Sequence, residues 1–139
     1  MQSTITNTEK QTYDFGFAFA KDIKAGSVIA LTGDLGVGKT IFVKGLAKAL
    51  GIDEHILSPT FTLLRQYNGL NHFDVYRIDD QSELSEIGFS EFLEDENITV
   101  IEWANLIYDI LPPNIIYINI SRTANEGQRK ISVSDEVIQ

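Results

Sequence analysis

The sequence predicts an α/β fold: a three-layer sandwich with a central, mostly parallel sheet and an antiparallel hairpin. Three observations indicate it. Short apolar runs typical of buried strands alternate with segments of helical periodicity. One such run, Ser27–Thr32, leads through a glycine-rich loop directly into a helix-like segment. Two further strand-like runs meet at Asn68-Gly69, a strong signal for a tight hairpin turn.

The first half of the chain divides into elements with clear boundaries. Thr8-Glu9-Lys10-Gln11 has the spacing of a capping box, so a helix should begin at Thr8 and end before Ala25-Gly26. After the second helix, Gly51 occupies the place of a C-terminal cap. The predicted elements are a helix from Thr8 to Ala20, a strand at Ser27–Thr32, the loop Gly33–Lys39 and a helix at Thr40–Leu50.

The second half is expected to supply most of the sheet. Asn68-Gly69 joins the two hairpin strands, Gly88 breaks a polar helical segment, and Pro112-Pro113 breaks the chain before the last strands. The predicted elements are strands at Phe61–Tyr67 and Leu70–Ile78, helix within Asp79–Leu93, a buried strand at Ile98–Trp103, and closing strands at Ile115–Ser121 and Arg129–Ser134 around the turn Thr123–Gly127.

Size and composition narrow the class of protein. The 139 residues correspond to one domain, residues 1–139, and 43% hydrophobic residues suffice for a core. No apolar run reaches the roughly 18 residues of a membrane span, so we expect no membrane partner. Met1–Glu9 is polar, which argues against a signal peptide. The chain has no cysteine, which fits a cytoplasmic location.

The charge disfavours direct binding to nucleic acid. The net charge is −9, from 11 basic and 20 acidic residues, and an acidic chain repels the phosphate backbone. Two explanations of the charge stay open: solubility, and an acidic face that docks a basic partner.

The loop carries the strongest functional signal. Its sequence satisfies the pattern G-x-x-x-x-G-K-[ST], with a predicted strand before it and a helix after it. The glycines let backbone N–H groups approach phosphate oxygens, and the following helix directs its positive end at the same place. This predicts a P-loop NTPase-like fold and a nucleotide-binding segment made of Gly33, Asp34, Leu35, Gly36, Val37, Gly38, Lys39 and Thr40.

Two residues of this loop have predicted roles in catalysis. Lys39 should reach the β- and γ-phosphates, and the Thr40 hydroxyl should bind Mg²⁺. GTPases usually read guanine with an Asn-Lys-x-Asp segment. Because the chain has none, we expect ATP as the nucleotide.

Carboxylates are the candidates for completing a magnesium site. Glu102 lies at the end of the predicted strand Ile98–Trp103, where P-loop proteins carry their second acidic motif. A carboxylate at a solvent-exposed strand end is the alternative explanation. Asp74 shares one face of its strand with His72 and Tyr76, since strand side chains alternate. From the pattern alone, a solvent-facing hairpin surface is the better explanation for His72 and an equal one for Asp74.

Two other residues are weaker candidates. Thr60, in Ser58-Pro59-Thr60-Phe61, could sense the γ-phosphate as switch threonines do, although a simple turn explains the segment as well. Trp103, the single tryptophan, is expected to anchor the core or an interface rather than to act in catalysis.

Four motifs, taken together and in order, resemble the bacterial TsaE family. They are GDLGVGKT at Gly33–Thr40, SPTFTL at Ser58–Leu63, HFDVYR at His72–Arg77 and IEW at Ile101–Trp103. The resemblance covers nearly the whole chain. It implies an ATPase subunit that binds ATP and Mg²⁺ and acts in tRNA threonylcarbamoyladenosine synthesis.

The resemblance also implies partners. TsaD and TsaB would install the threonylcarbamoyl group on the adenosine next to the anticodon. ATP hydrolysis by the present chain would reset their complex, and tRNA would be met only indirectly. A chain of this kind is a weak ATPase alone.

Residue roles follow from the resemblance by motif match. Lys39 and Thr40 take the loop roles, Asp74 and Glu102 are associated with magnesium or water, and Thr60 lies in the switch-like segment. Glu9 and Arg129 match positions near the base and sugar of the nucleotide.

Two other functions remain open from the sequence. A small-molecule kinase would share the loop but usually adds an arginine-bearing lid, and no segment here clusters several arginines. A non-hydrolysing nucleotide switch would use ATP binding alone to change partner affinity. It predicts that Glu102→Ala keeps both ATP binding and function.

Overall fold

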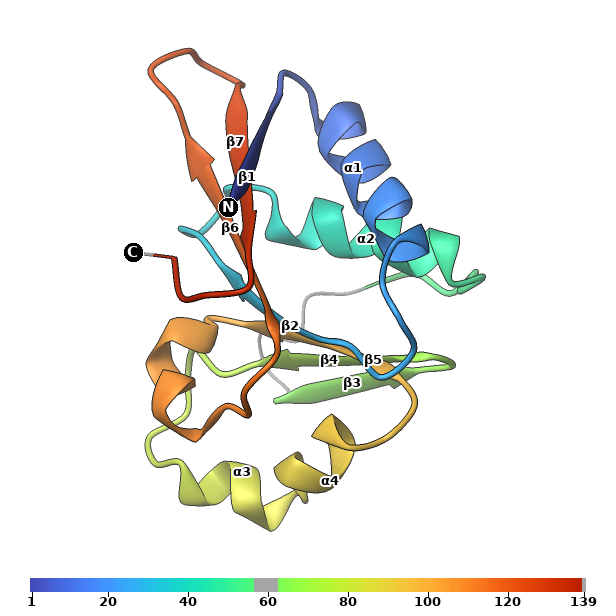
Figure 1. Cartoon of the computed structure of the whole chain (residues 1–139), viewed down its shortest axis with the longest axis vertical. Helices are drawn as coiled ribbons and strands as arrows, with labels where there is room; N and C mark the ends of the chain where they lie inside the picture. The colour runs from blue at the N-terminus through green and yellow to red at the C-terminus, as the bar shows by residue number, and fades with distance from the viewer. Residues whose placement is uncertain (57–62, 139) are drawn as a thin grey trace.

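A single seven-stranded sheet organises the chain (Figure 1). The computed structural model describes residues 1–56 and 63–138. The strand order is β1-β7-β6-β2-β5-β4-β3. The strands are β1 (Gln2–Thr6), β2 (Val28–Thr32), β3 (Leu64–Tyr67), β4 (Leu70–Asp74), β5 (Ile98–Glu102), β6 (Ile116–Arg122) and β7 (Arg129–Ser134).

The centre of the sheet is parallel, as the sequence predicts. Strand β2 pairs in parallel with both β5 and β6, and β5 pairs in parallel with β4. The outer pairings β3–β4, β6–β7 and β1–β7 are antiparallel, and β3–β4 is the predicted hairpin. Strands β2 and β5 are buried along their whole length, as continuous apolar runs require.

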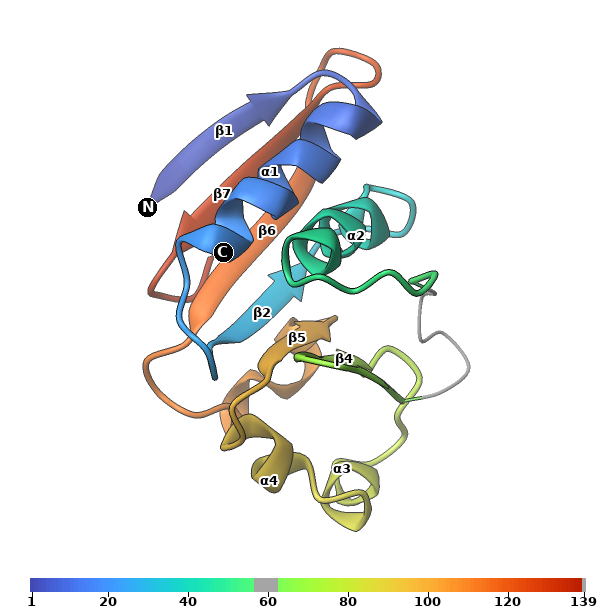
Figure 2. The same cartoon turned by 90° about the vertical axis from the view of Figure 1, so that its right-hand side faces the viewer.

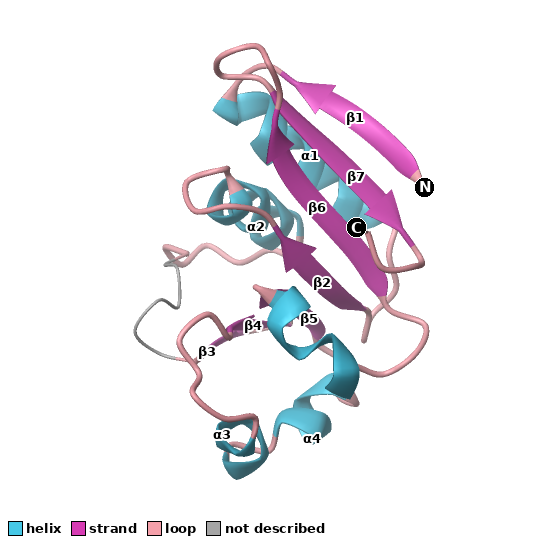
Figure 3. Cartoon of the chain, turned by 90° about the vertical axis from the view of Figure 1, so that its left-hand side faces the viewer, coloured by secondary structure: helices cyan, strands magenta, loops and turns pink. Residues whose placement is uncertain are grey.

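Helices cover both faces of the sheet and make it the middle of three layers. Helices α1 (Glu9–Lys21) and α2 (Lys39–Ala49) cover one face; α1 lies in front of the sheet in Figure 2 and behind it in Figure 3. Short helices α3 (Ser82–Glu86), α4 (Phe89–Leu93) and the 3₁₀ helix η1 (Ala104–Ile110) cover the other. A hydrophobic core lies on each face of the sheet, and successive side chains of β2 point into one core and then the other. Ile29 packs with Phe42 of α2, and Ala30 packs with Ile107 of η1. In the part of the chain that the structure describes, no helix is long and apolar enough to cross a membrane.

Helix α1 begins where the sequence predicts. The Thr8 side chain accepts a hydrogen bond from the Gln11 backbone N–H (3.1 Å), and Gln11 Oε1 accepts one from the Asn7 N–H (2.7 Å). These reciprocal bonds satisfy donors that the first turn leaves free. Gly88, with φ of 77°, separates α3 from α4 and so confirms the predicted break.

Three elements differ from the predictions. Strand β4 ends at Asp74 instead of Ile78, because the Asp74 carboxylate accepts the Tyr76 N–H (2.9 Å) in a tight turn. Strand β1 was not predicted, since QSTIT has no apolar alternation and is a strand through its pairing with β7. Helix η1 was not predicted either. The predicted strand start at Phe61 lies outside the described residues.

Two glycines let α1 and α2 cross closely. A Cβ on Gly45 would overlap the backbone oxygen of Tyr13, and one on Gly16 would overlap that of Phe42. This packing places the N-terminus of α1 beside the loop that precedes α2.

Gly45→Ala is therefore expected to lower the free energy of unfolding by about 2–3 kcal/mol, because the helices must separate. The loss would occur although alanine favours helix over glycine by about 1 kcal/mol. Urea denaturation measures the change. Lys48→Ala, an exposed change on the same helix, is the control and should stay within about 0.5 kcal/mol. Equal stability of the Gly45→Ala and wild-type chains would contradict the close crossing.

Candidate functional site at the glycine-rich loop

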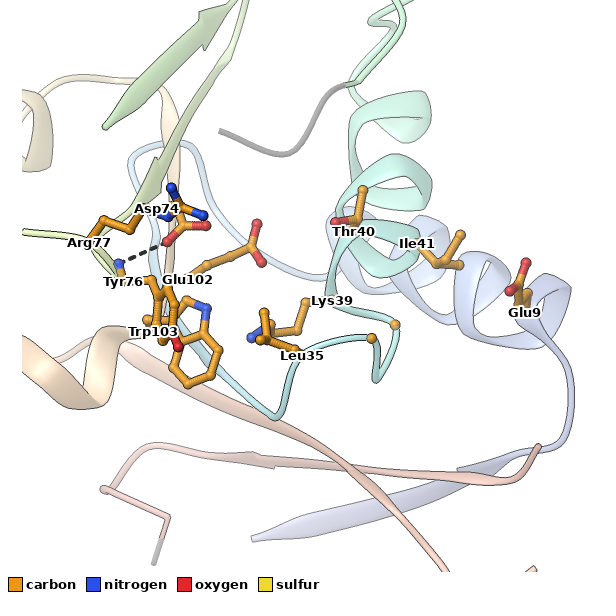
Figure 4. Close-up of a pocket in the computed structure, with 12 residues that line it drawn as sticks. Glu9, Leu35, Lys39, Thr40, Ile41, Asp74, Tyr76, Arg77, Glu102 and Trp103 are labelled. Atoms are coloured by element: carbon orange, nitrogen blue, oxygen red, sulfur yellow. Dashed lines mark hydrogen bonds between the residues drawn. The ribbon is translucent and has the colours of Figure 1, made fainter. Parts of the chain in front are cut away.

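A pocket of about 360 Å³ opens at the carboxyl end of the parallel strands (Figure 4). This is the edge at which ligands bind in open α/β sheets. Its lining comes from the loop and α2 (Leu35, Gly36, Gly38, Lys39, Thr40, Ile41), the end of β4 (Asp74, Tyr76, Arg77), the end of β5 (Glu102, Trp103) and the start of α1 (Glu9).

The loop backbone depends on its glycines. Gly33, Gly36 and Gly38 have φ of 148°, 74° and 115°, values that other residues rarely adopt. Between them, the Val37 side chain is buried in the core and anchors the loop to the body of the protein. Gly38 caps α2 without any side-chain hydrogen bond. The first N–H groups of α2 are thus available to an anion.

Lys39 lies buried on the floor of the pocket. Its side chain donates to the Gly33 carbonyl oxygen, and Nζ lies 3.9 Å from the centroid of the Trp103 ring. Burial lowers the pKa of the Lys39 ammonium below its ordinary value, and nearby carboxylates, Glu102 first among them, oppose the shift. The structure therefore brings the loop lysine and the two candidate acids into one pocket.

The two acids are neighbours because β4 and β5 are paired in register. Asp74 lies opposite Glu102, so both side chains leave the sheet on the same face at the strand ends. Burial raises the pKa of the Asp74 carboxyl. The hydrogen bond from the Tyr76 N–H lowers that pKa in part, and the negative charge of Glu102 raises it further. Asp74 therefore lines the pocket and does not lie on an open surface of the hairpin.

The explanation of His72 as a solvent-facing residue is wrong. The side chain is fully buried, and Nε2 lies 2.6 Å from Glu102 Oε2. Strand β4 is not an outer strand: β3 and β5 flank it, and the face that carries His72 also carries Leu70, part of the core beneath α2. Alternation within one strand cannot show that both of its faces are covered.

Other predicted site residues lie in different places. Glu9 lines the pocket from the start of α1. Arg129 does not line it; Nε donates to the Val37 carbonyl (2.8 Å), at a smaller cavity of about 60 Å³ that Glu9 also lines. Thr60 lies outside the described residues.

The pocket wall includes aromatic residues whose role the sequence did not predict. Trp103 packs against the second core, but it also lines the pocket and lies against Tyr76, with ring centroids 4.5 Å apart. Trp103 has φ of 62°, which is uncommon for a residue with a side chain and turns the chain at the end of β5. Arg77 also lines the pocket. The HFDVYR motif contained Tyr76 and Arg77, so the motif was the available signal.

The described residues include no group of three or more His, Asp or Glu side chains that could enclose a metal ion. This does not argue against magnesium, which usually keeps several waters and binds to one or two carboxylates together with phosphates. Thr40, Asp74 and Glu102, all at this pocket, form a donor set of that kind.

The fold and the site define a class of protein. It is an α/β domain in which a glycine-rich loop joins a central parallel strand to a helix and faces acids at the ends of neighbouring strands. The chain belongs to the TsaE family: the family model, described as threonylcarbamoyl adenosine biosynthesis protein TsaE, matches residues 6–131.

Individual relatives agree with this assignment. The tRNA threonylcarbamoyladenosine biosynthesis protein TsaE of Bacillus subtilis is 44% identical over 119 residues, which are 83% of this chain and 72% of that protein. TsaE of Treponema pallidum is 39% identical and covers 94% of this chain and 98% of its own length. The crystal structure of Bacillus subtilis YdiB superposes with a TM-score of 0.80 at 34% identity, covering 94% of this chain and 82% of that one.

Proposed function

We propose that this chain binds and hydrolyses ATP with Mg²⁺ as the ATPase subunit of tRNA threonylcarbamoyladenosine synthesis. The observation that carries the ATPase part is one pocket that joins the loop lysine and a helix N-terminus to two acids. The pathway is that of the family to which the chain belongs.

The binding part rests on the loop. Backbone N–H groups of the loop and of the α2 N-terminus surround phosphate oxygens, and Lys39 contributes its positive charge to the β- and γ-phosphates. The pocket volume, about 360 Å³, lies within the roughly 300–1,000 Å³ typical of small-ligand sites.

The hydrolytic part rests on the acids. Thr40, Asp74 and Glu102 would hold Mg²⁺ and the attacking water between them. Magnesium, when bound, supplies positive charge that neutralises the phosphate oxygens. The residues of the chain fix the positions of the reacting groups, which is the main contribution of a protein to phosphoryl transfer.

We further propose that the partners are TsaD and TsaB and that hydrolysis resets their complex. Lys39 is held by the Gly33 carbonyl and the Trp103 ring in the free chain. It must leave both to reach phosphates, which fits a protein that is slow alone. The net charge of −9 fits indirect contact with tRNA through the partners.

ATP should change the fluorescence of Trp103, the single tryptophan of the chain. The cause is that the Lys39 ammonium, 3.9 Å from the ring centroid, moves away when it meets phosphate. Titration should give a saturating change in emission, with the same dissociation constant as calorimetry. In Lys39→Ala the starting emission should already differ from wild type. Binding seen by calorimetry without any change in emission would contradict this movement.

Asp74→Asn should raise the Mg²⁺ concentration for half-maximal hydrolysis about tenfold, equivalent to about 1.4 kcal/mol. The reason is that a neutral amide oxygen binds the ion more weakly than a carboxylate. Magnesium titration of the ATPase rate measures the effect. Asp79→Asn, an exposed acid outside the pocket, is the matched control. Superimposable titrations for Asp74→Asn and wild type would remove Asp74 from the magnesium site.

A further inference from the structure

Glu102, one of the two acids of the pocket, forms a buried polar pair with His72. His72 is fully buried and Glu102 is 3% exposed, and His72 Nε2 lies 2.6 Å from Glu102 Oε2. The two residues come from adjacent strands, β4 and β5. A carboxylate oxygen only accepts hydrogen bonds, so Nε2 carries the proton and donates it.

Burial makes this contact persistent. A polar group removed from water is stable only while it is hydrogen-bonded, and breaking the contact would leave the fully buried His72 ring without a hydrogen bond. One oxygen of Glu102 is thereby fixed in place. A carboxylate with one oxygen fixed cannot turn freely, so the direction of its second oxygen is set as well.

The orientation of the Glu102 carboxylate matters because this residue lines the pocket. Glu102 lines the pocket, and Figure 4 shows its carboxylate between Asp74 and the first turn of α2, where Thr40 lies. His72 comes two residues before Asp74 on the same strand and faces the same side, so it supports Glu102 from the interior.

Among the described residues, the His72 ring has no hydrogen-bond partner other than Glu102. Nδ1 is buried and has no hydrogen-bond partner, so Nε2 is the ring atom that forms a polar contact, and that contact is with Glu102. A histidine kept for packing would be replaceable by an apolar residue of similar size without effect on the pocket.

From this geometry we propose that His72 is a positioning residue: its Nε2–H holds the Glu102 carboxylate in the orientation that the pocket needs for binding magnesium or orienting water. The proposal rests on the proposed function, because it assigns His72 to the same ATPase site. It parallels the ligand-orienting partners around metal sites, whose loss typically lowers affinity or activity about 10–100-fold.

The test uses the full chain with three variants. His72→Leu removes the donor at similar volume, and His72→Gln places an amide N–H near the position of Nε2. Asn71→Ala is the matched control: Asn71 is the adjacent residue, equally buried, and bonded to Asp95 and Thr99 on the opposite face. Two quantities are measured for each: kcat of ATP hydrolysis with the TsaD–TsaB pair, and the gain in ATP affinity on adding Mg²⁺. Thermal melting of each variant monitors folding.

We expect His72→Leu to lower kcat or the magnesium-dependent gain in affinity at least about tenfold. KM for ATP at saturating Mg²⁺ and ATP affinity without Mg²⁺ should stay within about threefold. His72→Gln should recover to within about threefold of wild type, and Asn71→Ala should match wild type in both quantities. The same losses in His72→Leu and Asn71→Ala, no loss in His72→Leu, or no recovery in His72→Gln would overturn the positioning role.

This design separates the inference from the proposed function. A wild-type chain that never hydrolyses ATP, even with partners, refutes the ATPase proposal. The magnesium-dependent gain in affinity then still decides whether His72 orients Glu102. Normal wild-type hydrolysis, with both kcat and the magnesium-dependent gain in affinity unchanged in His72→Leu, refutes the positioning role and leaves the ATPase proposal intact.

Discussion

Lys39→Ala is expected to weaken ATP binding about 10- to 100-fold without unfolding the chain. A charge-assisted hydrogen bond contributes about 1.5–3 kcal/mol, and Lys39 is the positive side chain on the pocket floor. The backbone N–H groups of the loop and helix remain, so residual binding should persist.

Isothermal calorimetry with ATP and Mg²⁺ measures this loss. Lys44→Ala is the matched control, because Lys44 lies one turn further along α2 and lines a different cavity. Thermal melting should show that the Lys39→Ala chain is folded. Equal affinities of wild type and Lys39→Ala would show that the loop does not bind the phosphates.

Glu102→Gln is expected to abolish turnover while ATP still binds. The amide keeps the shape of the carboxylate and can still accept the hydrogen bond of His72, so the pocket should persist. The negative charge that binds magnesium or orients water is lost. A general base contributes about 10²–10⁴-fold to a rate, so kcat should fall at least about 100-fold.

Two measurements are needed for this variant. Single-turnover hydrolysis with partners present gives the rate, and calorimetry gives the affinity, which should stay within about threefold of wild type. Glu86→Gln, a change at an exposed acid of α3, is the control. Full turnover in Glu102→Gln would show that Glu102 does not take part in hydrolysis.

The sequence predicted those features that lie within a short stretch of chain. The strand, loop and helix from Val28 to Ala49 follow one another, so the motif predicts both their structure and their proximity. The hairpin at Asn68-Gly69 is equally local. Strand β1 depends on pairing with β7, more than 120 residues away. Its own residues therefore carry no pattern that could reveal it.

The candidate site also depends on contacts between residues that are far apart in the sequence. Glu102 and Asp74 could be proposed individually, but their adjacency depends on the parallel pairing of β4 with β5. His72 was assigned to the surface because alternation describes one strand and not the layers around it. The contact of Arg129 with the Val37 carbonyl joins a distant strand to the loop, and no local pattern encodes such a contact.

The most direct test of the whole account is magnesium-dependent ATP hydrolysis by the chain, first alone and then with purified TsaD and TsaB from the same organism. We expect a low rate for the chain alone and a large increase with the pair. A rate that the pair leaves unchanged, with ATP still bound, would contradict it. In that case the small-molecule kinase and the non-hydrolysing switch become the better explanations, and a phosphorylated metabolite would identify the kinase.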